Sequence, residues 1–383
     1  MRKPTVRGRG RVRAGAAAAA RATRRLVFGA WPWSAAKAAR AATPRAASRS
    51  TCPPCCSSTL AREPEHARTR AWAASLRITA ARAAPACPRR TAALARTVTR
   101  ENGTPITERT TGYALTRDAR KILFGTTAGL VASDTNGAFD IYVYDRSTRR
   151  SSLASRRTNG TPLPLSPGDF YPTMDDTGTY VVLQTSASLV GADTNTTSDI
   201  YRIQVSNGAP YLITSSSSGV VANGSNSPAA NVSADGTRVA FSSKAGNLVN
   251  ADTNGAWDAF VKIIATGQTV RTSQTATGAQ GLTGGYCYAA VLNGNGRYAV
   301  LTCSANYLLP GNPGGSGDNL IKDLQTGAVT RLNKTQVGAV SPNAGEYPAI
   351  THDGSWVVFD LLDSNLFSPD TNGKGDVVVS SRQ

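Results

Sequence analysis

A seven-residue loop with two aspartates and one asparagine recurs along the second part of the chain. Four copies begin with Asp-Thr-Asn and end in Asp. Their oxygen-bearing residues are Asp134, Asn136, Asp140, Asp193, Asn195, Asp199, Asp252, Asn254, Asp258, Asp370, Asn372 and Asp376. Carboxylate and amide oxygens are hard ligands of the kind that Ca²⁺ prefers. The loops are therefore candidate calcium sites.

The same residues also suit a purely structural turn. The loop is shorter than an EF-hand loop and lacks its late bidentate Glu. Asp and Asn side chains readily bond nearby backbone N–H groups, and Gly accepts a positive φ. A further copy at 312–318 keeps only its final Asp318, and a lone carboxylate would hold no ion. We favour structural turns, expect no cofactor, and keep Ca²⁺ as the alternative.

Two cysteines flank a predicted turn in the fourth copy. Cys287 and Cys303 lie on either side of 293–296 and fall opposite each other to within about one residue. A cross-strand disulfide is expected if the chain is exported to an oxidising compartment. A buried pair of free thiols is the alternative.

The sequence lacks most signatures of known enzyme classes. The chain has no G-x-S-x-G elbow. Of its two histidines, His352 stands beside the turn residue Asp353, where an exposed side chain is the simpler interpretation. A glycosidase would need two carboxylates roughly 5–10 Å apart, which sequence cannot show. We therefore expect a protein that is not an enzyme.

These residues are placed by a repeat of about 59 positions. The last Asp of each copy falls at 140, 199, 258, 318 and 376, spaced by 59, 59, 60 and 58 residues. Each copy holds short runs of β-branched and aromatic residues bounded by Asp-Gly, Asn-Gly or Thr-Gly turns, which predicts four strands per copy. A four-stranded unit repeated in this way predicts an all-β fold, a β-propeller of four-stranded blades. Five blades are visible, at about 101–157, 158–217, 218–275, 276–335 and 336–383.

The two ends of the repeat suggest how the ring closes. The last copy stops after its third strand, whereas 96–100 has the pattern of a fourth strand. We expect strand 96–100 to complete the blade at 336–383, because closure removes an open sheet edge. The alternative is a ring of six or more blades in the intact gene.

The repeat carries a family resemblance. The string Val232-Ser-Ala-Asp-Gly-Thr-Arg-Val-Ala-Phe, followed by Asn247-Leu-Val-Asn-Ala-Asp-Thr-Asn-Gly-Ala-Trp-Asp and Thr266-Gly, resembles the WD-like repeats of TolB-type bacterial β-propellers with D-T-N-G loops. The resemblance covers about 96–383. It implies a propeller fold and a location at the cell envelope or outside the cell. It says little about activity, because propellers host binding, scaffolding and several enzyme classes.

The net charge of +18 belongs to a different part of the chain. Residues 1–100 hold 22 basic and two acidic residues, while 101–383 hold 20 basic and 22 acidic ones. Segment 1–95 is rich in Ala, Arg and Pro without a lasting apolar period, so we expect it to be disordered or a spurious translation. Its Thr23-Arg24-Arg25-Leu26-Val27-Phe28 resembles a twin-arginine export signal, which is the alternative. A nucleic-acid partner is not favoured, because the repeat region is almost neutral.

The sequence thus favours a non-enzymatic binding propeller, exported or envelope-associated, monomeric and without a membrane span. Its ligand would be a protein or a glycan, and the aromatic loop residues Phe139 and Trp257 are candidate contacts, although such residues also pack between blades. The alternative function is a carbohydrate-active hydrolase on a five-bladed propeller.

Overall fold

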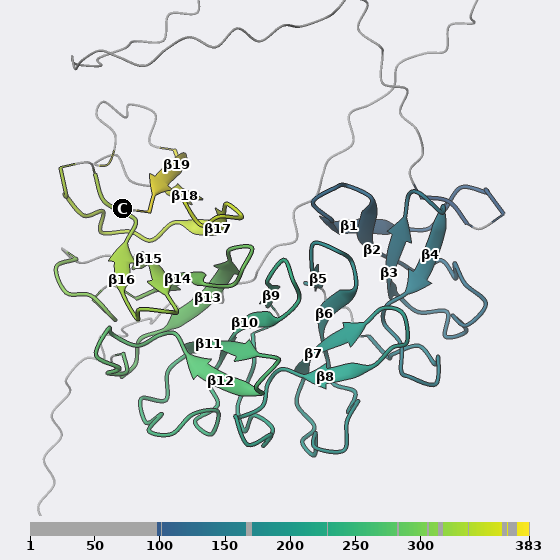
Figure 1. The fold of residues 1–383 in the computed structure, drawn as a ribbon, viewed down its shortest axis with the longest axis horizontal. Coiled ribbons are helices and arrows are strands. Elements are labelled where there is room, and N and C mark those ends of the chain that lie inside the picture. Colours follow the sequence, from purple (N-terminus) through teal and green to yellow (C-terminus); the bar gives the residue numbers. More distant parts are fainter. Residues whose placement is uncertain are drawn as a thin grey trace, which may run out of the picture. The chain divides into compact units, whose positions relative to one another are not determined.

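The structure is a computed structural model that describes residues 98–100, 102–165, 171–227, 229–281, 283–304, 306–312, 317–335, 337–361, 366 and 374–382. Its strands form five antiparallel sheets, in each of which every strand pairs with the next one in sequence (Figure 1). The predicted segment 1–95 and the loop residues Asp370 and Asn372 lie outside the described residues. We number the sheets as blades one to five.

The four strands of each complete blade follow the predicted order. Blade one contains β1 (Thr110–Leu115), β2 (Lys121–Thr126), β3 (Asp140–Asp145) and β4 (Arg150–Leu153). Blade two contains β5 (Thr173–Met174), β6 (Tyr180–Thr185), β7 (Asp199–Gln204) and β8 (Pro210–Leu212). Blade three contains β9 (Asn231–Val232), β10 (Arg238–Ser243), β11 (Asp258–Ile263) and β12 (Gln268–Arg271). Blade four contains β13 (Cys287–Leu292), β14 (Tyr298–Cys303), β15 (Asp318–Asp323) and β16 (Val329–Arg331), and blade five contains β17 (Glu346–Ile350), β18 (Trp356–Leu361) and β19 (Asp376–Ser381).

The second and third strands of blades one to four are largely buried on both faces. In β10 and β11, for example, five of the six residues are buried. Strands covered on both faces read as continuous apolar runs, which is why these segments do not alternate between polar and apolar residues. The all-β propeller prediction is confirmed, and the described residues include no helix.

A tight turn joins the first two strands of each blade and also contacts its neighbour. Gly178, Gly236, Gly296 and Gly354 occupy this turn with φ between 61° and 76°. The space is restricted as well, because a Cβ on Gly236 would lie 2.6 Å from the Tyr180 ring of the preceding blade. Blade one has Ala119 here with φ 54°, a conformation that costs a residue with a Cβ more than it costs glycine.

Four hydrophobic clusters lie between successive blades. Val143 and Leu183 belong to the cluster between blades one and two. Val182 and Phe241 lie in the second cluster, Val261 and Leu301 in the third, and Val300 and Phe359 in the fourth. Because successive blades cover each other's faces, the core of this fold is distributed over the interfaces between blades.

Blade five has one uncovered face. Val377 and Val379 of β19 are 73% and 60% exposed, whereas Ala259 and Val261, at the matching positions of β11, are 0% and 1% exposed. Trp356 is likewise 51% exposed, against 5% for its counterpart Tyr298. No hydrophobic cluster in the described part of the chain joins blade five to blade one.

The residues before blade one have the structure of a linker. Thr99 pairs with Pro105, as Arg156 pairs with Pro162 in the connection after β4. Val98 and Ile106 pack against blade one. Residues 98–100 therefore match the segment that follows a fourth strand, while residues 96 and 97 lie outside the described part. Completion of blade five by strand 96–100 stays a prediction.

Candidate functional site

In the first four acidic loops, the last Asp is fully buried and accepts a hydrogen bond from a side chain in or just after the fourth strand of the same blade. Ser155 donates through Oγ to Asp140 at 2.6 Å. Thr214 and Ser273 donate in the same way to Asp199 and Asp258. In the shortened fourth loop, Asp318 pairs with Arg331, with Nε 2.7 Å from Oδ1. Each of these carboxylates therefore ties the start of a third strand to the end of the blade.

Burial changes the acidity of these carboxyl groups. It raises the pKa of Asp140 to about 6, and the negative charge of Asp134 adds to the same effect. Burial also raises the pKa of Asp199 and that of Asp252. A carboxyl group that loses water on folding holds its proton more tightly, because the low-dielectric surroundings disfavour the anion.

The first Asp and the Asn of the first three loops already have partners. The Tyr142 hydroxyl donates to Asp134, and the Tyr201 hydroxyl donates to Asp193. Asp252 lies 3.6 Å from Arg271. The Asn side-chain oxygens accept from backbone N–H groups two residues later, in the pairs Asn136–Ala138 at 2.8 Å, Asn195–Thr197 at 2.8 Å and Asn254–Ala256 at 3.0 Å.

This arrangement is that of Asx turns. Within the described residues, no group of three or more His, Cys, Asp or Glu side chains is placed to hold a metal ion. In the fifth loop only Asp376 is described, half-buried at the start of β19. The turn interpretation has direct structural support in three loops, whereas calcium binding remains a prediction to be tested.

The two cysteines lie directly opposite each other in the hairpin of β13 and β14. The structure joins Cys287 and Cys303 by a disulfide. Both side chains are fully buried in the cluster between blades three and four. The bond therefore lies inside the apolar interface, away from water.

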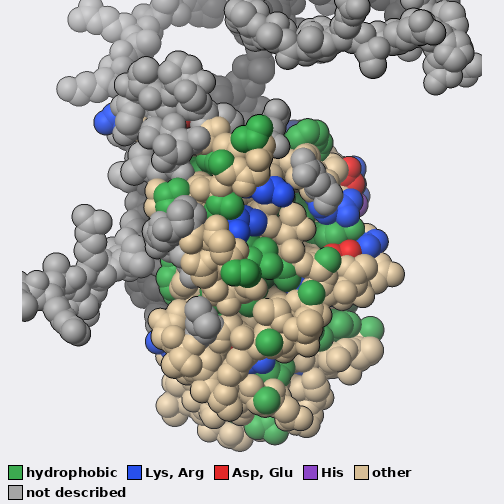
Figure 2. Space-filling view, turned by 90° about the vertical axis from the view of Figure 1, so that its left-hand side faces the viewer, with side chains coloured by type: hydrophobic (Ala, Val, Ile, Leu, Met, Phe, Trp, Pro, Cys, Tyr) green, Lys and Arg blue, Asp and Glu red, His purple; other side chains and the backbone are tan. Residues whose placement is uncertain are grey.

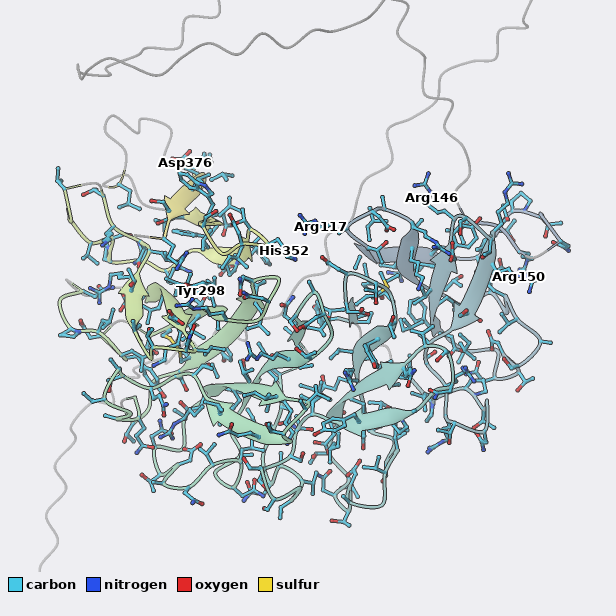
Figure 3. The ribbon with its side chains drawn as sticks, in the orientation of Figure 1. Arg117, Arg146, Arg150, Tyr298, His352 and Asp376 are labelled. Carbon is cyan, nitrogen blue, oxygen red and sulfur yellow. A yellow bond between two sulfur atoms is a disulfide. The ribbon has the colours of Figure 1, made fainter. Side chains whose placement is uncertain are left out.

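The turns at one end of the blades are linked by backbone hydrogen bonds. Asp176 N–H donates to Ala234 O, Ala234 N–H to Gly294 O, and Gly294 N–H to His352 O, each at 2.9 Å. The His352 ring lies against Gly294, and its Nε2 is 3.9 Å from a carboxylate oxygen of Asp176. In Figure 3, His352 and Arg117 mark the corresponding turns of blades five and one.

His352 has the exposed environment that the sequence predicted, with 49% of its side chain accessible. The neighbouring Asp353 accepts from Thr351 and Ser355, and these bonds hold the pKa of its carboxyl group well below the usual range. Asp353 is therefore occupied in its turn. Among the described residues, the imidazole has one distant carboxylate and no hydrogen bond to a hydroxyl group, which differs from the geometry of a catalytic triad.

The opposite end of blades three and four carries an aromatic cluster, which we define as Trp257, Tyr286 and Tyr288. The ring centroids of Trp257 and Tyr288 are 5.6 Å apart, and those of Tyr286 and Tyr288 are 5.3 Å apart. All three side chains are half-buried. The cluster lies where β11 and β13 begin (Figure 1). The two tyrosines were not singled out from sequence, although their alternation around Cys287 would place both on one face of a strand.

Phe139, the other aromatic residue predicted as a contact, has a different environment. It is half-buried, packs against the cluster between blades one and two, and fills the space beside Gly125. It therefore acts as a packing residue, which was the alternative interpretation of both loop aromatics.

No family model and no curated protein matches this chain. Solved structures similar to it include TolB from Acinetobacter baumannii, with 19% identity, a TM-score of 0.40, and coverage of 72% of this chain and 52% of that one. A putative TolB from Agrobacterium tumefaciens is 13% identical, with a TM-score of 0.41 and coverage of 72% and 78%. An oligogalacturonate lyase in complex with manganese is 14% identical, with a TM-score of 0.32 and coverage of 66% and 70%.

The five antiparallel sheets give the chain a β-propeller fold. Two of the similar solved structures are TolB proteins, as the predicted resemblance expects, and the matched region spans about half of the A. baumannii chain. At these identities the similarity extends to fold alone. In the described part of the chain, no helix is long and apolar enough to span a membrane.

Proposed function

We propose that this propeller is a non-enzymatic binding module that contacts its ligand through the end of the blades where the acidic loops lie. The observation that carries the proposal is the aromatic cluster. Aromatic side chains with a polar tip are enriched in binding surfaces, because they offer a large apolar area at a small cost in conformational entropy. Three such rings that are in contact and only half-buried form a surface suited to a ligand.

The described carboxylates support a binding role over hydrolysis. The pairs that influence each other's charge are those of the acidic loops, such as Asp134 with Asp140 and Asp252 with Asp258. Their second members are fully buried and hydrogen-bonded within the blade. An inverting or retaining glycosidase needs both carboxyl groups to reach the substrate. The burial of one member of each pair therefore supports a structural role for the acidic loops.

An exported or envelope location is part of this proposal. A disulfide inside a blade interface is stable in an oxidising compartment and is rare in the cytosol. The face drawn in Figure 2 also suits a protein that does not bind nucleic acid. Figure 2 shows one side of the molecule, where hydrophobic side chains are scattered among polar ones and basic side chains occur at separate places without forming one continuous patch.

The test compares binding with turnover on the same protein. The full chain is incubated with a panel of polysaccharides and with a display library of peptides, and both retention and released products are measured. Retention that falls about tenfold or more in Tyr288→Ala, without any product, is expected. Release of new reducing ends from a polysaccharide would contradict the proposal and favour the hydrolase.

A further inference from the structure

We infer that the aromatic cluster is a binding site for a neutral oligosaccharide. This inference rests on the proposed function and names the ligand class of that site. Sugar rings present an apolar C–H face and a rim of hydroxyl groups. A row of aromatic rings with polar tips meets both features, since the ring faces cover the C–H groups and the phenol and indole groups bond at the rim.

The three rings form one continuous surface. Tyr288 lies between the other two, tilted by 46° to Trp257 and by 32° to Tyr286. The ring centroids follow each other at 5.6 and 5.3 Å, so neighbouring rings are in contact and leave no gap between them. A twisted row of this kind can contact successive units of an extended chain, whereas a single ring would contact only one.

The backbone beneath the rings is held in place. Cys287 N–H donates to Trp257 O at 2.8 Å, and Tyr286 N–H donates to Ser304 Oγ at 2.8 Å. The disulfide of Cys287 lies between the two tyrosines in sequence. A surface fixed before binding loses little conformational entropy when the ligand arrives.

Tyr307 supports the cluster from within the interface. Its ring fills the space beside Gly281 and Gly285, where a Cβ would overlap it. Its hydroxyl accepts from Asn254 Nδ2 at 3.0 Å and donates to Asp258 at 3.2 Å, which fixes the residue that follows Trp257. The cluster is therefore supported from both blades that contribute to it.

The residues at the positions of Tyr288 and Trp257 differ between blades. The register of the first two strands aligns Tyr288 with Thr111 in blade one and with Glu346 in blade five. The position of Trp257, just before the buried Asp, is occupied by Phe139, Ser198 and Gly317 in blades one, two and four. The repeat itself therefore does not require an aromatic residue at either of these two positions.

The charges around the cluster favour a neutral ligand. The Lys244 ammonium is 5.6 Å from the centre of the Trp257 ring. On the other side, the charge of Glu346 contributes to the raised pKa of Tyr286, whose main cause is burial. Glu346 in turn bonds through its N–H to Asp360 at 2.8 Å. The carboxylate of Glu346 offsets the ammonium of Lys244, and the absence of a net positive charge disfavours a polyanionic glycan.

Affinity electrophoresis of the full chain tests the inference. The gels contain neutral glucans, mannans, galactans or soluble chitin derivatives, with polygalacturonate as the anionic comparison. Wild-type protein should be retarded by at least one neutral polymer. Trp257→Ala and Tyr288→Ala should each weaken retardation about tenfold, while Tyr288→Phe keeps most of it. Trp356→Ala removes an exposed ring on blade five and is the matched control, expected to behave as wild type.

Melting curves show whether each variant remains folded. If Trp257→Ala does not fold, Tyr286→Ala and Lys244→Ala provide the same comparison at the edges of the cluster. Retardation by no polymer, by polygalacturonate alone, or equally in wild type and Tyr288→Ala would overturn the inference. If sugars fail but a library peptide binds in a Tyr288-dependent way, the ligand class is wrong and the proposed function stands. If neither binds, both are wrong.

Discussion

Blades three and five have similar residues on one corresponding face, but the surroundings of that face differ. In blade three it packs against blade four. Val261 and Val379 occupy the same position of the third strand, yet one is 1% and the other 60% exposed. The difference lies in the neighbour, because blade four covers the first face with Leu301 and Leu320 and nothing among the described residues covers the second in this way. An apolar position in a repeat protein therefore contributes to stability only as far as an adjacent repeat buries it.

An aspartate introduced at position 261 should lower the free energy of unfolding far more than one introduced at position 379. We expect this to be the largest of the differences predicted here. Val261→Asp puts an unpaired carboxylate into a dry interface and should cost about 4 kcal/mol or more of unfolding free energy. Val379→Asp should change it by less than about 0.5 kcal/mol, because the side chain stays in water. Urea unfolding of both variants measures the difference. Equal losses would show that blade one closes over this face in solution.

Removal of aromatic rings from one strand extends the comparison within β18. Phe359 is buried between blades four and five, so Phe359→Ala should cost about 3–5 kcal/mol. Trp356→Ala removes a larger ring from the uncovered side and should cost about 1 kcal/mol or less. Thermal and urea unfolding provide the measurement. A larger loss for Trp356→Ala would mean that its ring stacks on the Ala119 turn, as Tyr298 does on Gly354.

Removal of the disulfide tests whether one interface contains an extra constraint. The double variant Cys287→Ser, Cys303→Ser should lose about 2–4 kcal/mol in the oxidised protein, since the bond closes a loop of 16 residues. Reductant should destabilise wild type and leave the variant unchanged. Alkylation of native protein followed by mass spectrometry is the control, and two modified thiols there would contradict the disulfide.

The buried carboxyl group of blade one predicts a pH effect of smaller size. The pKa of Asp140 is raised to about 6 in the folded chain, so between about pH 4 and pH 6 the folded state keeps a proton that the unfolded state has lost. This group's contribution to stability therefore falls as pH rises through that window. The free energy of unfolding, measured with urea at pH 4, 5 and 6, should fall less steeply with pH in Asp140→Asn than in wild type. Asp376→Asn, in the blade with the uncovered face, is the matched variant. Identical slopes for Asp140→Asn and wild type would contradict the assignment.

Added calcium should have the smallest effect. The Asn oxygens and the first Asp of three loops are already bonded, so millimolar Ca²⁺ should leave the melting temperature unchanged. The measurement is a melting curve with calcium and then with a chelator. A rise that the chelator reverses would show that the loops of the covered blades bind the ion after all.

Several features of the fold could be predicted from local patterns alone. The spacing of Asp140, Asp199 and Asp258 indicated the repeat, and Asp-Gly turns such as that at Gly236 indicated strand ends. The opposition of Cys287 and Cys303 followed from counting along a hairpin. The cluster of Trp257 with Tyr288 could not be predicted, because it joins a loop of one blade to the first strand of the next.

The sequence by itself determined the repeat, the four-stranded unit and the turns, because these depend on contacts within one copy. Only the tertiary structure decided which copies of the same residue are buried. Trp356 and Tyr298 share a position but differ in exposure, and Phe139 and Trp257 share a loop but differ in surroundings. The physical reason is that blades bury their faces against each other, so the fate of a side chain depends on residues about 60 positions away and on the neighbour that presents them.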